Sequence, residues 1–185
     1  DTIALTTANV FRNLNWSGYT GTWTHSTFNY TMYGDLTWGS GMTLTISGAG
    51  TFTFARTSGT STITCNGKSM GNVTINGVGG TVALGDTFSA NATNGTITLT
   101  NGTFNASNQN LSIPAFSSSN ANTRTITMGS GTWTLTGTGT VWNTATITGL
   151  TLNQDTSTIL LSNTTTTART FAGGGETFNN LTIGG

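Results

Sequence analysis

The chain has 185 residues, enough for one domain, and only 5% of them are charged, compared with roughly 25% in a typical soluble domain. Five basic and five acidic residues are spread singly, so the formal net charge is zero and no basic run offers a footprint for nucleic acid. No apolar stretch approaches the roughly 20 residues of a membrane-spanning helix, and the single cysteine, Cys65, excludes an internal disulfide.

Residue usage points to an all-β protein with many short turns. Threonine makes up about a quarter of the chain, and there are 26 glycines. Threonine, valine, isoleucine and aromatic residues favour pleated strands, whereas glycine and asparagine supply the left-handed positions of tight corners. A regular supply of leucine, isoleucine, phenylalanine and tryptophan argues against disorder.

Residues 1–40 are rich in aromatic side chains and contain the single histidine, His25. We interpret this part as an N-terminal cap or attachment segment, because large rings cover the open end of an elongated stack efficiently. The functional alternative is a ligand or partner surface formed by Trp16, Trp23, Tyr33 and Trp38. His25 has no cysteine, histidine or carboxylate at ligand spacing, so we expect no metal site.

Residues 41–185 read as a repeat domain of short strands. Alternating segments such as 42–46, 51–54 and 96–100 are separated by turn signals that include Asn76-Gly77 and Asn94-Gly95. In the clearest stretch, 124–142, glycines separate three strands of about four residues each. No window places apolar residues at helical spacing, so we expect no helix.

One phrase recurs: a small polar or glycine residue, a branched apolar residue, threonine or a substitute, and a large apolar residue. It occurs at 13–16, 35–38, 72–75, 110–113, 149–152 and 180–183. Most intervals are in the high thirties, while a solenoid coil of three strands and three corners needs roughly 20 residues. We therefore predict a right-handed parallel β-helix in which the phrases stack on every second coil. An antiparallel β-sandwich is the alternative, because Asn-Gly pairs also make hairpins.

The charged residues suggest no active site. Asp155 and Glu176 are about one coil apart, but each lies beside a turn, where a lone acid is usually solvated. We expect no enzyme activity, no catalytic residues and no cofactor. Arg12, Arg56, Arg124 and Arg169 are expected along the surface, their stems covering apolar rows or contacting a neighbouring subunit.

The second half resembles a known class of repetitive sequences. The segments are FSSSNANTRTI at 116–126, GTWTLTGTGTVW at 131–142, ARTFAGGG at 168–175 and FNNLTI at 178–183. They resemble Thr/Gly/Asn-rich β-solenoid structural proteins of tailed bacteriophages, notably from aquatic metagenomes, and adhesin-like bacterial surface repeat proteins. The similarity covers 70–185 well and 1–69 poorly. It implies a virion-borne or extracellular repeat protein and transfers no catalytic residues.

The leading expectation is a structural fibre or spike component of a virion or cell surface, forming a rigid β-rod. With few charged residues to protect strand edges, we expect self-association as a homotrimer or filament, or assembly with other structural subunits. A glycan-binding adhesin or receptor-recognition module is the first alternative, and it requires the four rings named above to lie exposed in a row. An ice-binding solenoid is the second, because Thr-x-Thr pairs such as Thr132/Thr134 abound, although their irregular spacing argues against it.

Overall fold

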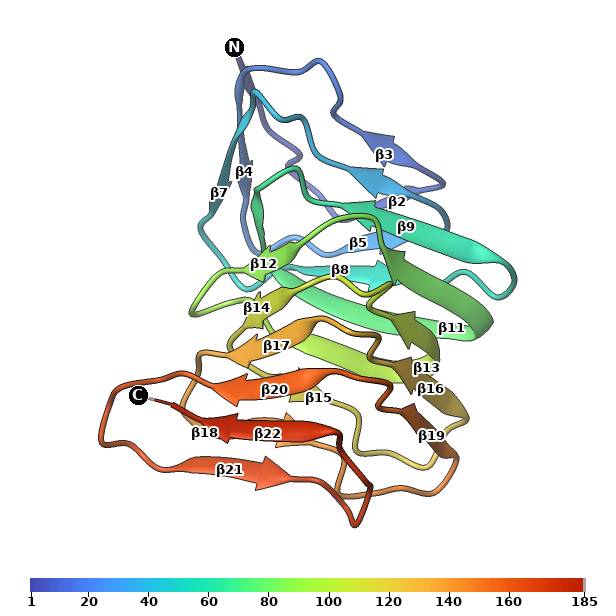
Figure 1. Ribbon diagram of the computed structural model, residues 1–185. Helices are drawn as coiled ribbons and strands as arrows, with labels where there is room; N and C mark the ends of the chain where they lie inside the picture. Colours follow the sequence, from blue (N-terminus) through green and yellow to red (C-terminus); the bar gives the residue numbers. More distant parts are fainter. Residues whose placement is uncertain (185) are drawn as a thin grey trace.

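The structure, a computed structural model, describes residues 1–184 and is an elongated parallel β-helix of about eight coils (Figure 1). Every strand pairing in this part of the chain is parallel, and it contains no helix. The predicted β-solenoid is confirmed, and the antiparallel sandwich is excluded. Gly185, the last residue of the expected repeat range, lies outside the described residues.

Each coil passes three sides, named here in chain order. Side one carries two separate sheets: a three-stranded sheet of β1 (Thr2–Ile3), β4 (Thr22–His25) and β7 (Thr43–Ile46), and a six-stranded sheet of β10 (Ser69–Met70), β12 (Phe88–Ala90), β14 (Leu111–Ile113), β17 (Thr132–Leu135), β20 (Thr158–Leu161) and β22 (Asn180–Ile183). Side two carries β2 (Asn9–Phe11), β5 (Tyr30–Met32), β8 (Thr51–Phe54), the first parts of β11 (Asn72–Leu84) and β13 (Ile97–Asn105), β15 (Phe116–Ser117), β18 (Gly139–Asn143) and β21 (Arg169–Ala172). Side three carries β3 (Leu14–Asn15), β6 (Leu36–Thr37), β9 (Thr60–Thr64), the second parts of β11 and β13, β16 (Arg124–Thr127) and β19 (Leu150–Asn153).

Coil length varies from one turn of the helix to the next. On side two, the coil that leads from Ile97 to its partner Phe116 is short, whereas the coil that leads from Trp142 to its partner Phe171 is distinctly longer. The prediction that the repeated phrases stack on every second coil is therefore wrong. The phrase at 110–113 lies in β14 on side one, while the phrase at 149–152 lies in β19 on side three. Because corners differ in length, a constant interval in sequence does not return the chain to the same side.

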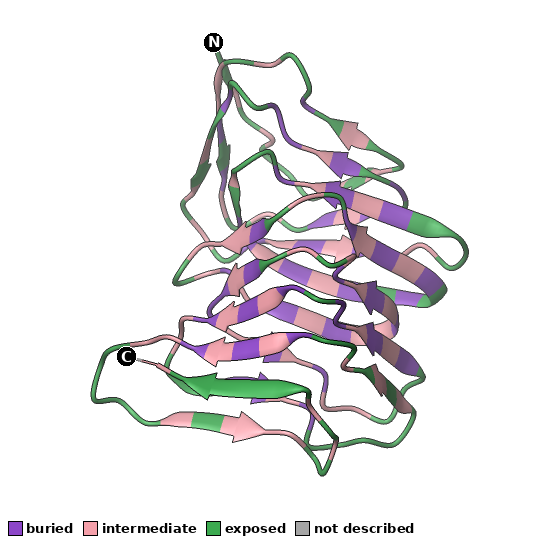
Figure 2. Ribbon diagram, in the orientation of Figure 1, coloured by how far each residue is buried: buried purple, intermediate pink, exposed green. Residues whose placement is uncertain are grey.

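Alternation along the strands builds the core. Inward residues form columns, such as Phe52, Val73, Ile97, Phe116 and Trp142 on side two, and all of these are buried. Figure 2 shows buried and partly exposed residues alternating along many of the strands, in contrast to the uniformly exposed β22. Burying each large apolar side chain contributes about 1.5–3 kcal/mol, so the columns supply the main driving force for stacking.

Residues 1–40 form the first two coils of this stack. Strand β4 of the second coil pairs with β7 of the third, and β5 pairs with β8, so strand pairing continues without a break across residue 40. The aromatic side chains of this segment thus lie at the beginning of the same core that runs through the later coils.

Outward positions form columns of threonine. On side three, one column is uninterrupted over five coils: Thr60, Thr81, Thr103, Thr125 and Thr151. Side two has a shorter column, with Thr31, Thr53, Thr74 and Thr98 followed by Ser117. Corners absorb the differences in coil length, so irregular spacing in the sequence becomes regular spacing in the structure.

Asparagine and aspartate side chains join neighbouring coils at the corners. The side-chain oxygens of Asn29, Asn72 and Asn110 accept hydrogen bonds from backbone N–H groups of the next coil at 2.8–3.2 Å. The Asp35 carboxylate likewise accepts from Thr62 N of the next coil, whereas the Asp86 carboxylate reaches back to Cys65 N and Asn66 N of the preceding coil. These bonds satisfy backbone donors that the strand ladders leave unpaired.

Candidate functional site

The aromatic residues proposed as a ligand surface separate into two groups. Trp16, Trp23 and Trp38 are buried and pack against one another, with ring centroids 5.2–6.1 Å apart. The expectation of an exposed row of rings is therefore wrong for the three tryptophans. They occupy inward positions of their coils, where alternation directs large apolar side chains into the core. Tyr33, with 48% of its surface exposed, is the one member of the set at the surface.

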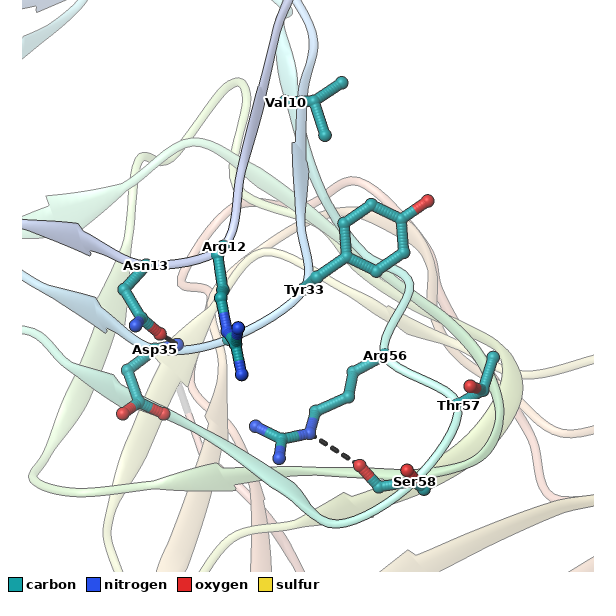
Figure 3. A pocket seen from close by; sticks show the side chains of 9 residues that line it. Val10, Arg12, Asn13, Tyr33, Asp35, Arg56, Thr57 and Ser58 are labelled. Atoms are coloured by element: carbon teal, nitrogen blue, oxygen red, sulfur yellow. Dashed lines mark hydrogen bonds between the residues drawn. The ribbon is translucent and has the colours of Figure 1, made fainter.

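Tyr33 lies in a surface depression of about 640 Å³ at the corner between sides two and three of the first three coils (Figure 3). The depression is lined by Val10, Arg12, Asn13, Tyr33, Gly34, Asp35, Arg56, Thr57 and Ser58. Phe11, Met32 and Phe54 are stacked partners at the ends of β2, β5 and β8. The residues that follow them in each coil therefore emerge at the same corner.

The charged side chains of this corner face a common space. Arg12 comes from the first coil and Arg56 from the third, and Figure 3 shows both guanidinium groups directed into the depression below Tyr33. Arg56 is fixed by donating from Nε to Ser58 O at 2.5 Å and from Nη1 to Thr60 O at 2.9 Å. The Asp35 carboxylate accepts a hydrogen bond from Thr62 N at 2.8 Å, so part of its hydrogen-bonding capacity is already used. The corner thus carries two positive charges and one negative charge.

His25 belongs to the core and not to a surface site. Its ring stacks on Trp23 with centroids 5.6 Å apart and contacts Phe52 at 4.7 Å. Burial lowers the pKa of His25, and a hydrogen bond between Nε2 and Phe28 O partly opposes that shift. Nε2 consequently carries the proton of a neutral ring, and Nδ1 is buried with no hydrogen-bond partner in the described chain.

Cys65 is fully buried directly after the end of β9. Burial raises the pKa of its thiol far above the ordinary value, and the neighbouring Asp86 charge raises it further. A thiol that stays protonated is a poor nucleophile, so Cys65 is structural.

Arg124 departs most from the sequence expectation. It is buried, not at the surface, and it donates to the carbonyl oxygens of Ser118, Asn122, Thr146 and Thr148. Burial lowers the pKa of Arg124, but an arginine stays charged in proteins, so these carbonyl dipoles replace a counter-ion. The half-buried Arg169 makes two similar bonds, to Leu161 O and Gly184 O at 3.1 Å.

Among the described acids, Asp155 takes part in the contacts between coils. The Asp155 carboxylate accepts a hydrogen bond from Gly129 N at 2.9 Å, which gives it a role in joining coils. Within residues 1–184, no cluster of three or more histidine, cysteine, aspartate or glutamate side chains could hold a metal ion. The same part of the chain contains no helix long and apolar enough to cross a membrane.

No protein-family model, curated protein or solved structure matches this chain. The corner depression around Tyr33 is therefore the candidate site, identified from its geometry and charge. The sequence located Tyr33 but missed the two arginines as its neighbours. Their convergence depends on the nearly equal lengths of the first coils, which set Phe11, Met32 and Phe54 in register.

Proposed function

We propose that this chain is a rigid structural segment of a fibre or spike at a virion or cell surface, and that it self-associates. The observation that carries the proposal is the all-parallel stack of about eight coils around three sides, in which side two forms one continuous ladder from β2 to β21. At about 4.8 Å per coil, it forms a rod nearly 40 Å long whose backbone is hydrogen-bonded from coil to coil. Such a rod transmits force and resists proteases without a large globular core.

The exposed strand β22 is the surface that we propose for association. All four residues of β22 are exposed, including Leu181 at 46% and Ile183 at 63%. β22 pairs with β20 on one edge, and a strand added at its other edge would extend the ladder of side one. An added coil would also cover Leu181 and Ile183, which makes stacking favourable.

The association is tested with purified protein by sedimentation velocity and negative-stain electron microscopy. We expect trimers or filaments that depend on concentration, and loss of those assemblies in Leu181→Lys, which places a charge on the exposed edge. Thr156→Lys, at an exposed turn position, is the matched control and should assemble like the parent chain. A strictly monomeric parent chain at high concentration would refute self-association.

The location is tested by following tryptic peptides of the chain in a density gradient of the source material. Co-banding with intact virus particles at fixed stoichiometry supports a virion fibre or spike. Recovery with cell envelopes or free filaments instead supports a cell-surface fibre and removes the phage assignment. Recovery only in the soluble protein fraction would contradict both locations.

A second candidate function, ice binding, is favoured by the in-register threonine column of side three. Ice binding needs flat, regularly spaced hydroxyl and methyl groups, and Thr60, Thr81, Thr103, Thr125 and Thr151 follow one another at the coil spacing. The adjacent outward column is broken by Ala83, Asn105 and Asn153, which weakens this candidate relative to the structural one. Thermal hysteresis that Thr103→Tyr abolishes and Thr134→Tyr preserves would support it, and absence of hysteresis would end it.

A further inference from the structure

We propose that the corner depression of the first three coils is a binding site for a saccharide bearing one anionic group, a carboxylate or a sulfate. Arg12 and Arg56 would hold the anion, and Tyr33 would pack against the sugar ring (Figure 3). This site is separate from the rod-forming function and does not depend on it.

The depression concentrates the positive charge of the chain. The chain has five lysine and arginine residues in total, and two of them line this single depression. They come from different coils and lie far apart in the sequence, so the fold and not local sequence brings them together. Two guanidinium groups directed into one space repel each other, and an anion between them relieves that repulsion while receiving paired N–H donors.

One of the two guanidinium groups is preorganised. The hydrogen bonds from Arg56 to Ser58 O and Thr60 O hold its guanidinium in place before any ligand arrives. Figure 3 draws no hydrogen bond from Arg12 to another residue of the depression, and we expect its donors to be available to a ligand. A fixed donor from one coil and a second donor from another coil suit a planar carboxylate or a tetrahedral sulfate.

The depression also has exposed apolar side chains, which favour a sugar over a free ion as the ligand. Tyr33 is 48% exposed and Val10 is 69% exposed, an unusual degree for large apolar side chains in this structure. An exposed tyrosine ring can pack on the C–H face of a sugar while its hydroxyl stays in water. Thr57 and Ser58 add hydroxyl groups at the rim, and about 640 Å³ is within the usual range for small-ligand sites.

The overall charge limits the ligand to few anionic groups. The chain has a net charge of zero, and Asp35 lines the depression together with the two arginines. The corner therefore does not offer the extended positive field that a nucleic acid or another polyanion requires. A mono-anionic saccharide matches the local balance of two positive charges and one negative charge.

The proposal is tested by titrating the full chain with four probes: 3′-sialyllactose, lactose 3′-sulfate, lactose and sodium sulfate. Binding is measured by calorimetry and by NMR shifts of the backbone amides of Tyr33, Thr57 and Ser58. We expect one or both anionic lactoses to bind at least about tenfold more tightly than lactose and than sulfate, with weaker binding at higher salt. If sodium sulfate bound as tightly as the anionic lactoses, the proposal of a saccharide ligand would be refuted. If neither anionic lactose bound at millimolar concentration, the binding site itself would be refuted.

Variants separate the roles of the three side chains. Arg12→Met should weaken the anionic lactose about tenfold or more, and Tyr33→Ala should weaken it about threefold to tenfold with little effect on sulfate. Lys68→Met, which removes a positive charge outside the depression, is the matched control and should bind like the parent chain. Arg56→Met is informative only where circular dichroism shows the parent fold. Since Figure 3 draws no hydrogen bond from Arg12 to the other lining residues, we expect Arg12→Met to leave the depression intact, and unchanged binding by that variant overturns the proposal.

Discussion

Replacing Arg124 by methionine should destabilise the fold, because the guanidinium organises two corners at once. Its Nε and Nη2 atoms donate to Ser118 O at 3.0 and 2.7 Å, and its Nη1 atom donates to Asn122 O at 2.9 Å and Thr148 O at 2.7 Å. Nη2 also donates to Thr146 O. The bonds thus connect the corner at 118–123 with the corner of the next coil at 144–149.

The magnitude follows from which carbonyl groups lose their partner. The bond to Ser118 O is buried, and leaving such an acceptor unsatisfied costs about 1–3 kcal/mol. The bonds to Asn122, Thr146 and Thr148 are partly buried, so water can replace much of each contribution. Methionine fills most of the volume, and removing a buried charge recovers part of its desolvation cost. We expect the free energy of unfolding to fall by about 2–4 kcal/mol.

Guanidinium chloride unfolding followed by tryptophan fluorescence measures this change, and hydrogen exchange locates it. Exchange should accelerate at 118–123 and 144–149 before it does in the first coils. Arg124→Lys should not rescue stability, since an ammonium group lacks the planar fork that reaches four carbonyl oxygens. Arg169→Met, which removes two bonds of a half-buried side chain, should cost about 1 kcal/mol. A loss of less than about 0.5 kcal/mol in Arg124→Met would refute the reasoning.

Three further predictions concern the core and the corners. Burial lowers the pKa of His25, so below pH 6.5 the unfolded chain binds a proton that the folded chain does not. The free energy of unfolding should therefore decrease as the pH falls from 7.5 to 5.5. In thermal melts, His25→Phe should make stability depend less on pH over this range. The raised pKa and burial of Cys65 predict no reaction with Ellman's reagent at pH 8 until the chain is unfolded, and fast labelling of the native protein would contradict this. A Cβ atom at Gly77 would collide with the backbone carbonyl of Arg56, so Gly77→Ala should cost about 1–3 kcal/mol in denaturant unfolding. Gly41→Ala, which meets only a threonine methyl group, should change stability by less than about 1 kcal/mol, and equal losses in the two variants would dismiss the backbone contact as the cause.

The fold class could be predicted from the sequence because each strand signals itself locally. Alternation in segments such as 132–135 gives the strand and its buried face, and glycine or asparagine marks the next corner. The sequence did not predict which strands pair between neighbouring coils. A phrase spacing in the high thirties suggested ladders on alternate coils, but the actual partners are separated by single coils of unequal length, and the phrases change side with corner length. Corner length is set by turn geometry and contacts with neighbouring coils, which a local pattern does not contain.

The candidate site could be predicted only in part, for the same reason. Trp23 and Tyr33 look alike as exposed aromatic candidates in sequence, yet Trp23 takes an inward strand position and Tyr33 follows the end of β5 at a corner. The local sequence gives Arg124 and Arg12 the same expected surface position. Arg124 is nevertheless buried, because it lies at the start of a strand next to two corners whose carbonyl groups accept its hydrogen bonds. Whether a polar side chain is buried thus depends on the neighbouring coils, whose register is a property of the whole stack.

The contrast between strands and corners indicates which positions of such a solenoid can form a binding site. Strand positions are constrained on both sides, because inward residues fill the core and outward residues such as Thr81 and Thr103 stack on their partners in adjacent coils. Corners are free to vary in length without breaking the ladder, as the range of coil lengths shows. The excursion at 57–59 after Arg56 is such a variation, and it forms one wall of the depression that holds Tyr33. Shortening that corner should leave the stack folded while removing the depression, so recognition and rod formation can be changed independently in this molecule.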